Sequence, residues 1–101
     1  MPAKKTSSVR IAIIGTGGMA HYHARFFQKT RGCRLVAGVD TDPERLKAFV
    51  QAHNIPEAYS STTELLAQSE IDAAVIVTPD PYHKDITLEC IAAGKHVLCE
   101  K

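Results

Sequence analysis

Short apolar runs that recur along the chain constrain its fold more than any other feature. They cover residues 9–14, 35–39 and 73–77, and each is bounded by a glycine or a polar residue. The third run does not alternate apolar and polar residues, as expected of a strand whose sheet is covered on both faces. The sequence therefore predicts strands of a buried sheet at these three places.

Segments with helical spacing and capping residues separate these runs. We expect helices over residues 18–30, over residues 43–53 after Asp42 as N-cap, around residues 61–66 with Ser61 and Glu64 spaced as a capping box, and from Asp80 to a stop at Gly94. On the fourth helix, His83, Ile86, Cys90 and Ala93 should share one face. Two further short strands are expected over residues 58–59 and 96–99.

Strands and helices thus alternate, and right-handed crossovers between them produce a parallel sheet with helices on both faces. We predict the α/β class, with a Rossmann-type doubly wound parallel sheet in the strand order 3-2-1-4-5 that is truncated after the fifth strand. The 101 residues fit one domain. We expect a flexible polar leader over residues 1–8 and a dinucleotide-binding domain over residues 9–101.

Composition and charge exclude several classes of protein. No apolar run approaches the ~20 residues of a membrane span. Residues 1–34 hold seven Lys and Arg and no acid, but no aromatic-rich basic face accompanies them, so we expect neither a membrane nor a nucleic-acid partner. Three cysteines without a C-x-x-C pair indicate reduced thiols in a cytoplasmic protein.

A glycine-rich turn follows the first predicted strand. Residues 15–20 read G-T-G-G-M-A, a G-x-G-x-x-A pattern at a strand-to-helix transition. Gly15 permits the tight turn, and Gly17 lets the backbone of the loop, which also contains Thr16, approach a pyrophosphate. The N–H groups of Gly18 and Met19 are natural donors of hydrogen bonds to phosphate. A plain strand–helix turn is the alternative, and the context favours dinucleotide binding.

Asp40 ends the second predicted strand, 20 residues beyond Ala20, at the distance expected of a carboxylate that accepts from the adenosine ribose. The alternative is a turn residue before the Asp42 cap. Since a carboxylate repels a 2′-phosphate, NAD is favoured over NADP. Arg45 is a counterargument, which we discount because it lies five residues further on, in a helix.

Two segments in the second half of the chain carry a family resemblance. Residues 75–83 read VIVTPDPYH and residues 93–101 read AGKHVLCEK. Together they resemble the Gfo/Idh/MocA oxidoreductases, which include glucose–fructose oxidoreductase and inositol dehydrogenase, and the likeness runs from residue 9 to the last residue. The family usually has an amide where this chain has Asp80, which leaves the role of Asp80 open.

The resemblance implies further site residues. Thr78, Pro79 and His83 are expected beside the cofactor, although His83 can equally pack at its helix start. Glu100 looks like a ligand of the nicotinamide ribose, and Lys101 like the catalytic lysine near the substrate hydroxyl. His21, His23, His53 and His96 show no metal-ligand spacing with acids, so we expect no metal site.

Family members continue into a second domain that builds the substrate pocket, and no such sequence follows Lys101 here. We therefore expect a fragment or truncated product that is inactive by itself. Two functions compete: the NAD(P)-binding domain of an oxidoreductase that transfers hydride to or from a sugar, cyclitol or related polyol, and a nucleotide-binding module without catalysis. We also expect self-association through the C-terminal edge strand, which is apolar.

Overall fold

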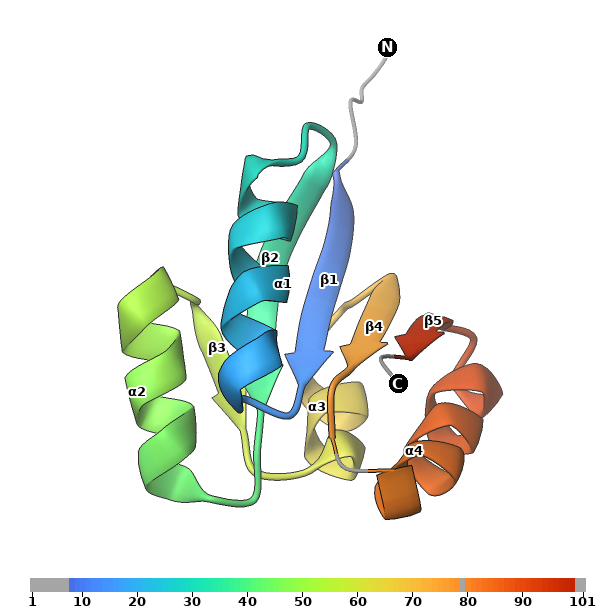
Figure 1. Ribbon diagram of the computed structural model, residues 1–101. Helices are drawn as coiled ribbons and strands as arrows, with labels where there is room; N and C mark the ends of the chain where they lie inside the picture. Colours follow the sequence, from blue (N-terminus) through green and yellow to red (C-terminus); the bar gives the residue numbers. More distant parts are fainter. Residues whose placement is uncertain (1–7, 79, 100–101) are drawn as a thin grey trace, which may run out of the picture.

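The computed structural model describes residues 8–78 and 80–99, and its strands form one parallel sheet (Figure 1). The strands are β1 (Val9–Ile14), β2 (Cys33–Val39), β3 (Glu57–Tyr59), β4 (Ala73–Ile76) and β5 (His96–Cys99). Their order across the sheet is β3-β2-β1-β4-β5. The predicted fold class and strand order are therefore confirmed. Of the leader predicted over residues 1–8, only Ser8 lies within the described residues.

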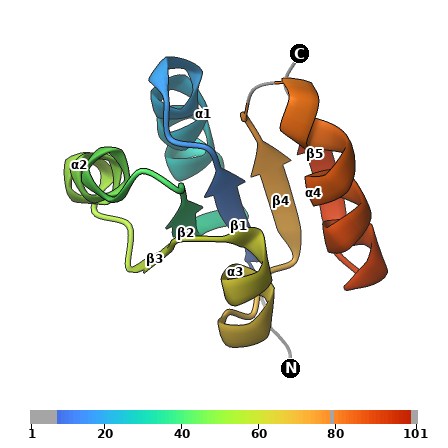
Figure 2. The ribbon, with the colours of Figure 1, turned by 90° about the horizontal axis from the view of Figure 1, so that it is seen from below.

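Helices cover both faces of this sheet, which makes it doubly wound. The helices are α1 (Gly18–Lys29), α2 (Pro43–His53), α3 (Thr62–Gln68) and α4 (Asp80–Ala92). Figure 2 looks along the sheet and shows α1 and α2 on one side of it, with α3 and α4 on the other. The connections through α1, α2 and α4 join neighbouring parallel strands, whereas the connection through α3 leads from β3 at one edge past β2 and β1 to β4.

The central strand β1 is apolar on both faces because both faces are buried. Ile11 and Ile13 face α1 and α2, where they join one core cluster with Ala24 and Phe49. Ala12 and Ile14 face α3 and α4 and join a second cluster. Because both sets are buried, the strand has no face left for polar residues, and the sheet separates two cores.

The element boundaries differ from the predicted ones in small ways that have physical reasons. β2 begins at Cys33, two residues early, because Cys33 and Arg34 continue the ladder with Val9 and Arg10. Cys33 is half-buried and Arg34 is exposed, so the two do not extend the buried apolar run that predicted the strand. Ala93, which was predicted to share a face of the fourth helix with His83, Ile86 and Cys90, lies one residue beyond the end of α4 at Ala92 and is exposed.

The predicted caps are present. The Asp42 carboxylate accepts from the backbone N–H groups of Glu44 and Arg45, and the Ser61 hydroxyl accepts from that of Glu64. The Glu64 carboxylate in turn accepts from the N–H of Ser60, one residue before the partner that a capping box uses. These caps fix where α2 and α3 begin, and both helices begin beside the same edge of the sheet.

Replacing Phe49 by alanine tests the core between α2 and the sheet. Phe49 is fully buried, and its ring lies against Gly38 of β2. We expect Phe49→Ala to lower the free energy of unfolding by about 3–5 kcal/mol, measured by urea unfolding followed by circular dichroism. The control Gln51→Ala, at an exposed position of the same helix, should change it by no more than about 0.5 kcal/mol. Equal effects of the two changes would contradict this packing.

Candidate functional site

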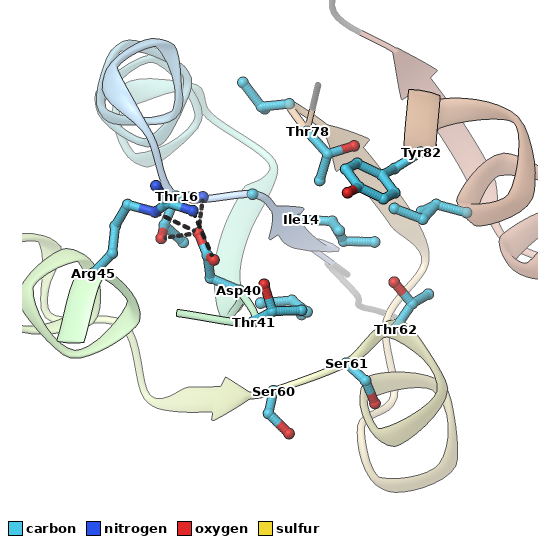
Figure 3. A pocket seen from close by; sticks show the side chains of 14 residues that line it. Ile14, Thr16, Asp40, Thr41, Arg45, Ser60, Ser61, Thr62, Thr78 and Tyr82 are labelled. Carbon is cyan, nitrogen blue, oxygen red and sulfur yellow. Dashed lines mark hydrogen bonds and ion pairs between the residues drawn. The ribbon is translucent and has the colours of Figure 1, made fainter. Parts of the chain in front are cut away.

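A cavity of about 410 Å³ opens at the carboxyl ends of the parallel strands (Figure 3). This is the edge where doubly wound sheets bind their ligands, beside the point at which the strand order reverses between β1 and β4. The cavity is lined by Ile14, Gly15, Thr16, Val39, Asp40, Thr41, Arg45, Ser60, Ser61, Thr62, Val77, Thr78, Tyr82 and Ile86. Its volume falls within the range of cofactor pockets.

Gly15 is required by the packing of the turn after β1. Its φ of 97° lies in the left-handed region, and its N–H donates to the carbonyl of Val39 at 2.7 Å. A Cβ at this position would lie 2.9 Å from the backbone nitrogen of Thr78. The turn after β1 is therefore pressed against the end of β4, and only glycine permits this approach.

Gly17, unlike Gly15, has open space around it. It is the N-cap of α1, and no side chain of its own caps the helix. A Cβ built on Gly17 or on Gly18 meets nothing within 4 Å. The exposed N-terminus of α1 therefore borders open space, where its N–H groups can approach an anion. Gly17, Gly18 and Met19 follow Thr16 directly but are not among the residues that line the cavity.

Asp40 lies at the end of β2, and its carboxylate is enclosed by donors from three segments (Figure 3). Oδ2 accepts from the backbone nitrogen of Thr16 at 3.0 Å and from its hydroxyl at 2.7 Å. Oδ1 accepts from the backbone nitrogen of Asp42 at 2.9 Å. The carboxylate therefore joins the turn after β1 to the loop that enters α2.

Arg45 completes this arrangement, which corrects an expectation from the sequence. Its Nε donates to Oδ2 of Asp40 at 2.9 Å, and its terminal nitrogen Nη2 donates to Oδ1 at 3.0 Å. Its distance along the chain, for which Arg45 was discounted, does not keep it away from Asp40, because Arg45 lies in the first turn of α2. Helical side chains lean toward the helix N-terminus, and this one reaches back to the end of β2.

The environment of Asp40 favours its charged form. Burial of the carboxyl raises its pKa, but hydrogen bonds from Arg45, from Thr16 and from the N–H of Asp42 together outweigh burial. The pKa of Asp40 consequently lies well below its usual range. Asp40 is therefore ionised at neutral pH, and its charge is paired with the Arg45 guanidinium in the lining of the cavity.

Thr78 and His83 lie together at the carboxyl end of β4. The Nε2–H of His83 donates to the carbonyl of Thr78, which ties the start of α4 to the end of β4. The Thr78 hydroxyl oxygen is buried and has no hydrogen-bond partner among the described residues. Such a group at a cavity wall can serve a ligand. Pro79, Glu100 and Lys101 lie outside the described residues.

Several lining residues were not singled out as site residues from the sequence. Ser60, Ser61 and Thr62 place a row of hydroxyl groups where the chain passes from β3 into α3, and Tyr82 of α4 lies across the cavity from them (Figure 3). Ile86 of α4 also lines the cavity. Ser61 was recognised only as a cap. Their position in the sequence could have identified them as site residues. They directly follow a predicted strand, and the carboxyl ends of parallel strands lie at the edge of the sheet where ligands bind.

The described residues contain neither a candidate metal centre nor a candidate membrane span. Within them, no group of three or more His, Cys, Asp or Glu side chains could hold a metal ion. His21 and His53 lie close together, with 2.7 Å between Nδ1 and Nε2, but they form a pair between α1 and α2. None of the described helices is long and apolar enough to cross a membrane.

Replacing Asp40 by asparagine tests its electrostatic role. A carboxylate whose pKa is lowered on folding stabilises the protein above its unfolded pKa of about 4, and that contribution is lost as the pH falls through the folded value. We expect Asp40→Asn to lower the free energy of unfolding by about 1–3 kcal/mol at pH 7. The difference from the unmodified chain should shrink between about pH 4 and pH 2 in urea titrations. A difference that is the same at both pH values would contradict this role.

Comparison with known proteins identifies the family. The model of the "Oxidoreductase family, NAD-binding Rossmann fold" (GFO_IDH_MocA) matches residues 9–101. Inositol 2-dehydrogenase of Rubrobacter xylanophilus is 35% identical over 94 residues, which are 92% of this chain and 27% of that protein. Trans-1,2-dihydrobenzene-1,2-diol dehydrogenase of Xenopus laevis is 44% identical over 68 residues, 67% of this chain and 21% of that protein.

Solved structures agree with these relatives. Myo-inositol 2-dehydrogenase of Lactobacillus plantarum superposes with a TM-score of 0.87 at 33% identity, covering 94% of this chain and 28% of that one. The WlbA dehydrogenase of Bordetella pertussis, solved with NADH and UDP-GlcNAcA, superposes with a TM-score of 0.88 at 34% identity, covering 93% and 29%. The chain thus spans about a quarter of the length of its relatives. It belongs to the Gfo/Idh/MocA oxidoreductases and represents their NAD-binding Rossmann domain, as the resemblance of its sequence implied.

Proposed function

We propose that the cavity at the carboxyl ends of the strands binds NAD(H) for an oxidoreductase that acts on a sugar, cyclitol or related polyol. The observation that carries the proposal is the junction of the Gly15–Gly17 turn with the buried carboxylate of Asp40. A turn with room for a pyrophosphate and an anion placed for ribose hydroxyls are the two halves of a dinucleotide site. The names of the relatives, which are inositol and diol dehydrogenases, support a polyol substrate.

The residues of this chain divide the binding between them. The N–H groups of Gly18 and Met19 would donate hydrogen bonds to the pyrophosphate. Gly17 would leave room for it, because Gly17 has no side chain and the space where a Cβ would lie is open. Asp40 would accept from the adenosine ribose, and the unpartnered hydroxyl of Thr78 is available to the cofactor at the end of β4. Bound NAD supplies the hydride acceptor, and the protein supplies its orientation.

The remaining assignments rest on the family resemblance. We propose Pro79 and His83 at the cofactor, Glu100 as a ligand of the nicotinamide ribose and Lys101 as the catalytic lysine at the substrate oxygen. An ammonium group there can hydrogen-bond the reacting oxygen and stabilise negative charge as its proton leaves. The unpaired cysteines of the described structure support a cytoplasmic location.

Turnover is proposed for the whole protein and not for this segment, which spans about a quarter of the length of its relatives. Hydride transfer requires a substrate held with its carbon close to the nicotinamide, and the cavity at the carboxyl ends of the strands is the one that we propose for the cofactor. The 101-residue chain by itself should therefore bind the cofactor without oxidising polyols.

Calorimetric titration of the chain with NADH and NADPH tests the proposed function. We expect NADH to bind more tightly, and Asp40→Ala to weaken it by about 1–3 kcal/mol through loss of the ribose acceptor. Gly17→Ala should keep the fold but weaken NADH about tenfold or more, a loss of about 1.4 kcal/mol, because its methyl group enters the path of the pyrophosphate. Gly15→Ala, in contrast, should also lose thermal stability, since its Cβ meets the backbone of Thr78.

Two results would overturn the assignment. If the unmodified chain bound NADPH more tightly than NADH, the preference for NAD would be wrong. If it bound neither while its circular dichroism was that of a folded α/β protein, the cavity would not be a dinucleotide site.

We further propose that the 101-residue chain associates with itself through β5. Among the described strands, β5 pairs only with β4, so its other edge presents unpaired backbone groups. Leu98 on this strand is 52% exposed, and Leu88 and Ile91 of the neighbouring α4 are also exposed. Leu98 therefore offers an exposed apolar side chain at this edge that a second chain can cover.

Light scattering over a concentration series tests this association. The unmodified chain should gain apparent mass with concentration, and Leu98→Lys should shift it toward the monomer because a charged edge disfavours strand pairing. The control Lys84→Leu, at an exposed position of α4, should not restore the monomer. A chain that stays monomeric at high concentration would contradict the proposal.

A further inference from the structure

Two histidines from different helices contact each other and form a histidine pair, His21 and His53. His21 lies in the first turn of α1, and His53 is the last residue of α2. Nδ1 of His21 and Nε2 of His53 are 2.7 Å apart, which is a hydrogen-bond distance. Both rings also lie against the fully buried ring of Phe49, with centroids 5.1 Å and 5.0 Å from it. The two half-buried rings therefore join α1 to the end of α2 at the margin of the core.

The contact depends on how many protons the two rings carry. A neutral imidazole has one N–H donor and one acceptor nitrogen, whereas a protonated imidazole has two donors and no acceptor. The hydrogen bond can therefore form when both rings are neutral or when one of them is protonated. When both are protonated, two N–H groups and two positive charges face each other, so attraction gives way to repulsion.

The surroundings of His53 disfavour its charged form. Partial burial and the charges of His21 and Arg25, both on α1, each lower the pKa of His53. Phe49, which contacts the ring from α2, is apolar and offers no counter-charge. The carbonyl groups at the end of α2 favour a cation, but Gln28 of α1 donates to the His53 carbonyl at 2.6 Å and so satisfies one of them. The pKa of His53 is lowered nonetheless, so burial and the two neighbouring charges outweigh the helix end.

The position of the pair gives its protonation a structural consequence. The hydrogen bonds from His21 and from Gln28 both end on His53. The next residue, Asn54, has a φ of 54° and turns the chain from α2 toward β3. Loss of the contact between the rings would therefore weaken the packing of α1 on α2 at the point where α2 ends.

We propose that the histidine pair is a pH-sensitive switch in the packing of α1 against α2: it joins the two helices while at most one ring is protonated, and no longer does so when both are. The inference goes beyond the proposed function, because neither ring lines the cavity and the test requires no cofactor.

The direction of the pH dependence follows from linkage. A histidine whose pKa is lowered on folding binds its proton more readily in the unfolded chain. Its contribution to stability is present above the unfolded pKa of about 6.5 and is lost as the pH falls through the folded value. Acidification should therefore weaken the folded chain in this range of pH.

Urea unfolding followed by circular dichroism, at about pH 7.5 and about pH 5, tests the switch. A low chain concentration avoids self-association, and a chelator excludes a metal bridge between the rings. His53→Gln keeps a donor and an acceptor but does not titrate. On acidification, the ratio of folded to unfolded chain should fall about three- to tenfold further in the unmodified chain than in His53→Gln. The control His96→Gln, at an exposed position of β5, should lose as much as the unmodified chain.

Proton NMR of the histidine rings tests the pair without relying on stability, and so also covers the case in which His53→Gln does not fold. In the unmodified chain, His53 should titrate with a midpoint below its ordinary value, as its lowered pKa implies. His21→Gln removes a neighbouring charge and should raise that midpoint, whereas His96→Gln should leave it unchanged.

Three results would contradict the switch. Equal losses of stability in His53→Gln and in the unmodified chain would show that the pair does not carry the pH dependence. A loss in His96→Gln that is as small as the one expected of His53→Gln would assign that dependence to another histidine. A His53 midpoint that stays the same in His21→Gln would show that the two rings do not interact.

Discussion

The buried carboxylate of Asp40 is the junction on which the candidate site depends. It accepts hydrogen bonds from the turn after β1 and from the loop into α2, and so fixes the ends of two neighbouring strands relative to each other. A charge in this position is stable only because five donors surround it. The same hydrogen bonds that hold the backbone of the site also keep its one acid ionised.

Packing of the sheet places this junction where a ligand can reach it. Because both faces of the central strand β1 are buried, this strand has no polar face, and functional side chains must come from beyond its end. The close approach of Gly15 to Thr78 draws the ends of β1 and β4 together and leaves the cavity between the loops. The position of the site thus follows from the fold. Because the centre of the sheet is apolar on both faces, the polar residues of the site gather at its carboxyl edge.

Much of this arrangement could be predicted from the sequence, because its signals are local. The apolar runs, the Asp42 cap and the glycine turn each lie within a few consecutive residues, and the structure confirms the strand order that they imply. The contact between Arg45 and Asp40 was missed because it depends on the direction in which α2 leaves the sheet. The hydroxyl row of Ser60, Ser61 and Thr62 was missed because β3 is only three residues long and carries little apolar signal.

Arg45 and the backbone donors stabilise the Asp40 carboxylate in different ways. The N–H groups of Thr16 and Asp42 belong to the backbone, so their positions follow from the fold. Arg45 reaches Asp40 from a half-exposed side chain and supplies the positive charge that the backbone lacks. A buried carboxylate without such a counter-charge is costly, because hydrogen bonds from neutral groups leave its charge unpaired. The acid at the end of β2 therefore depends both on the local fold of two loops and on one side chain of the helix that follows.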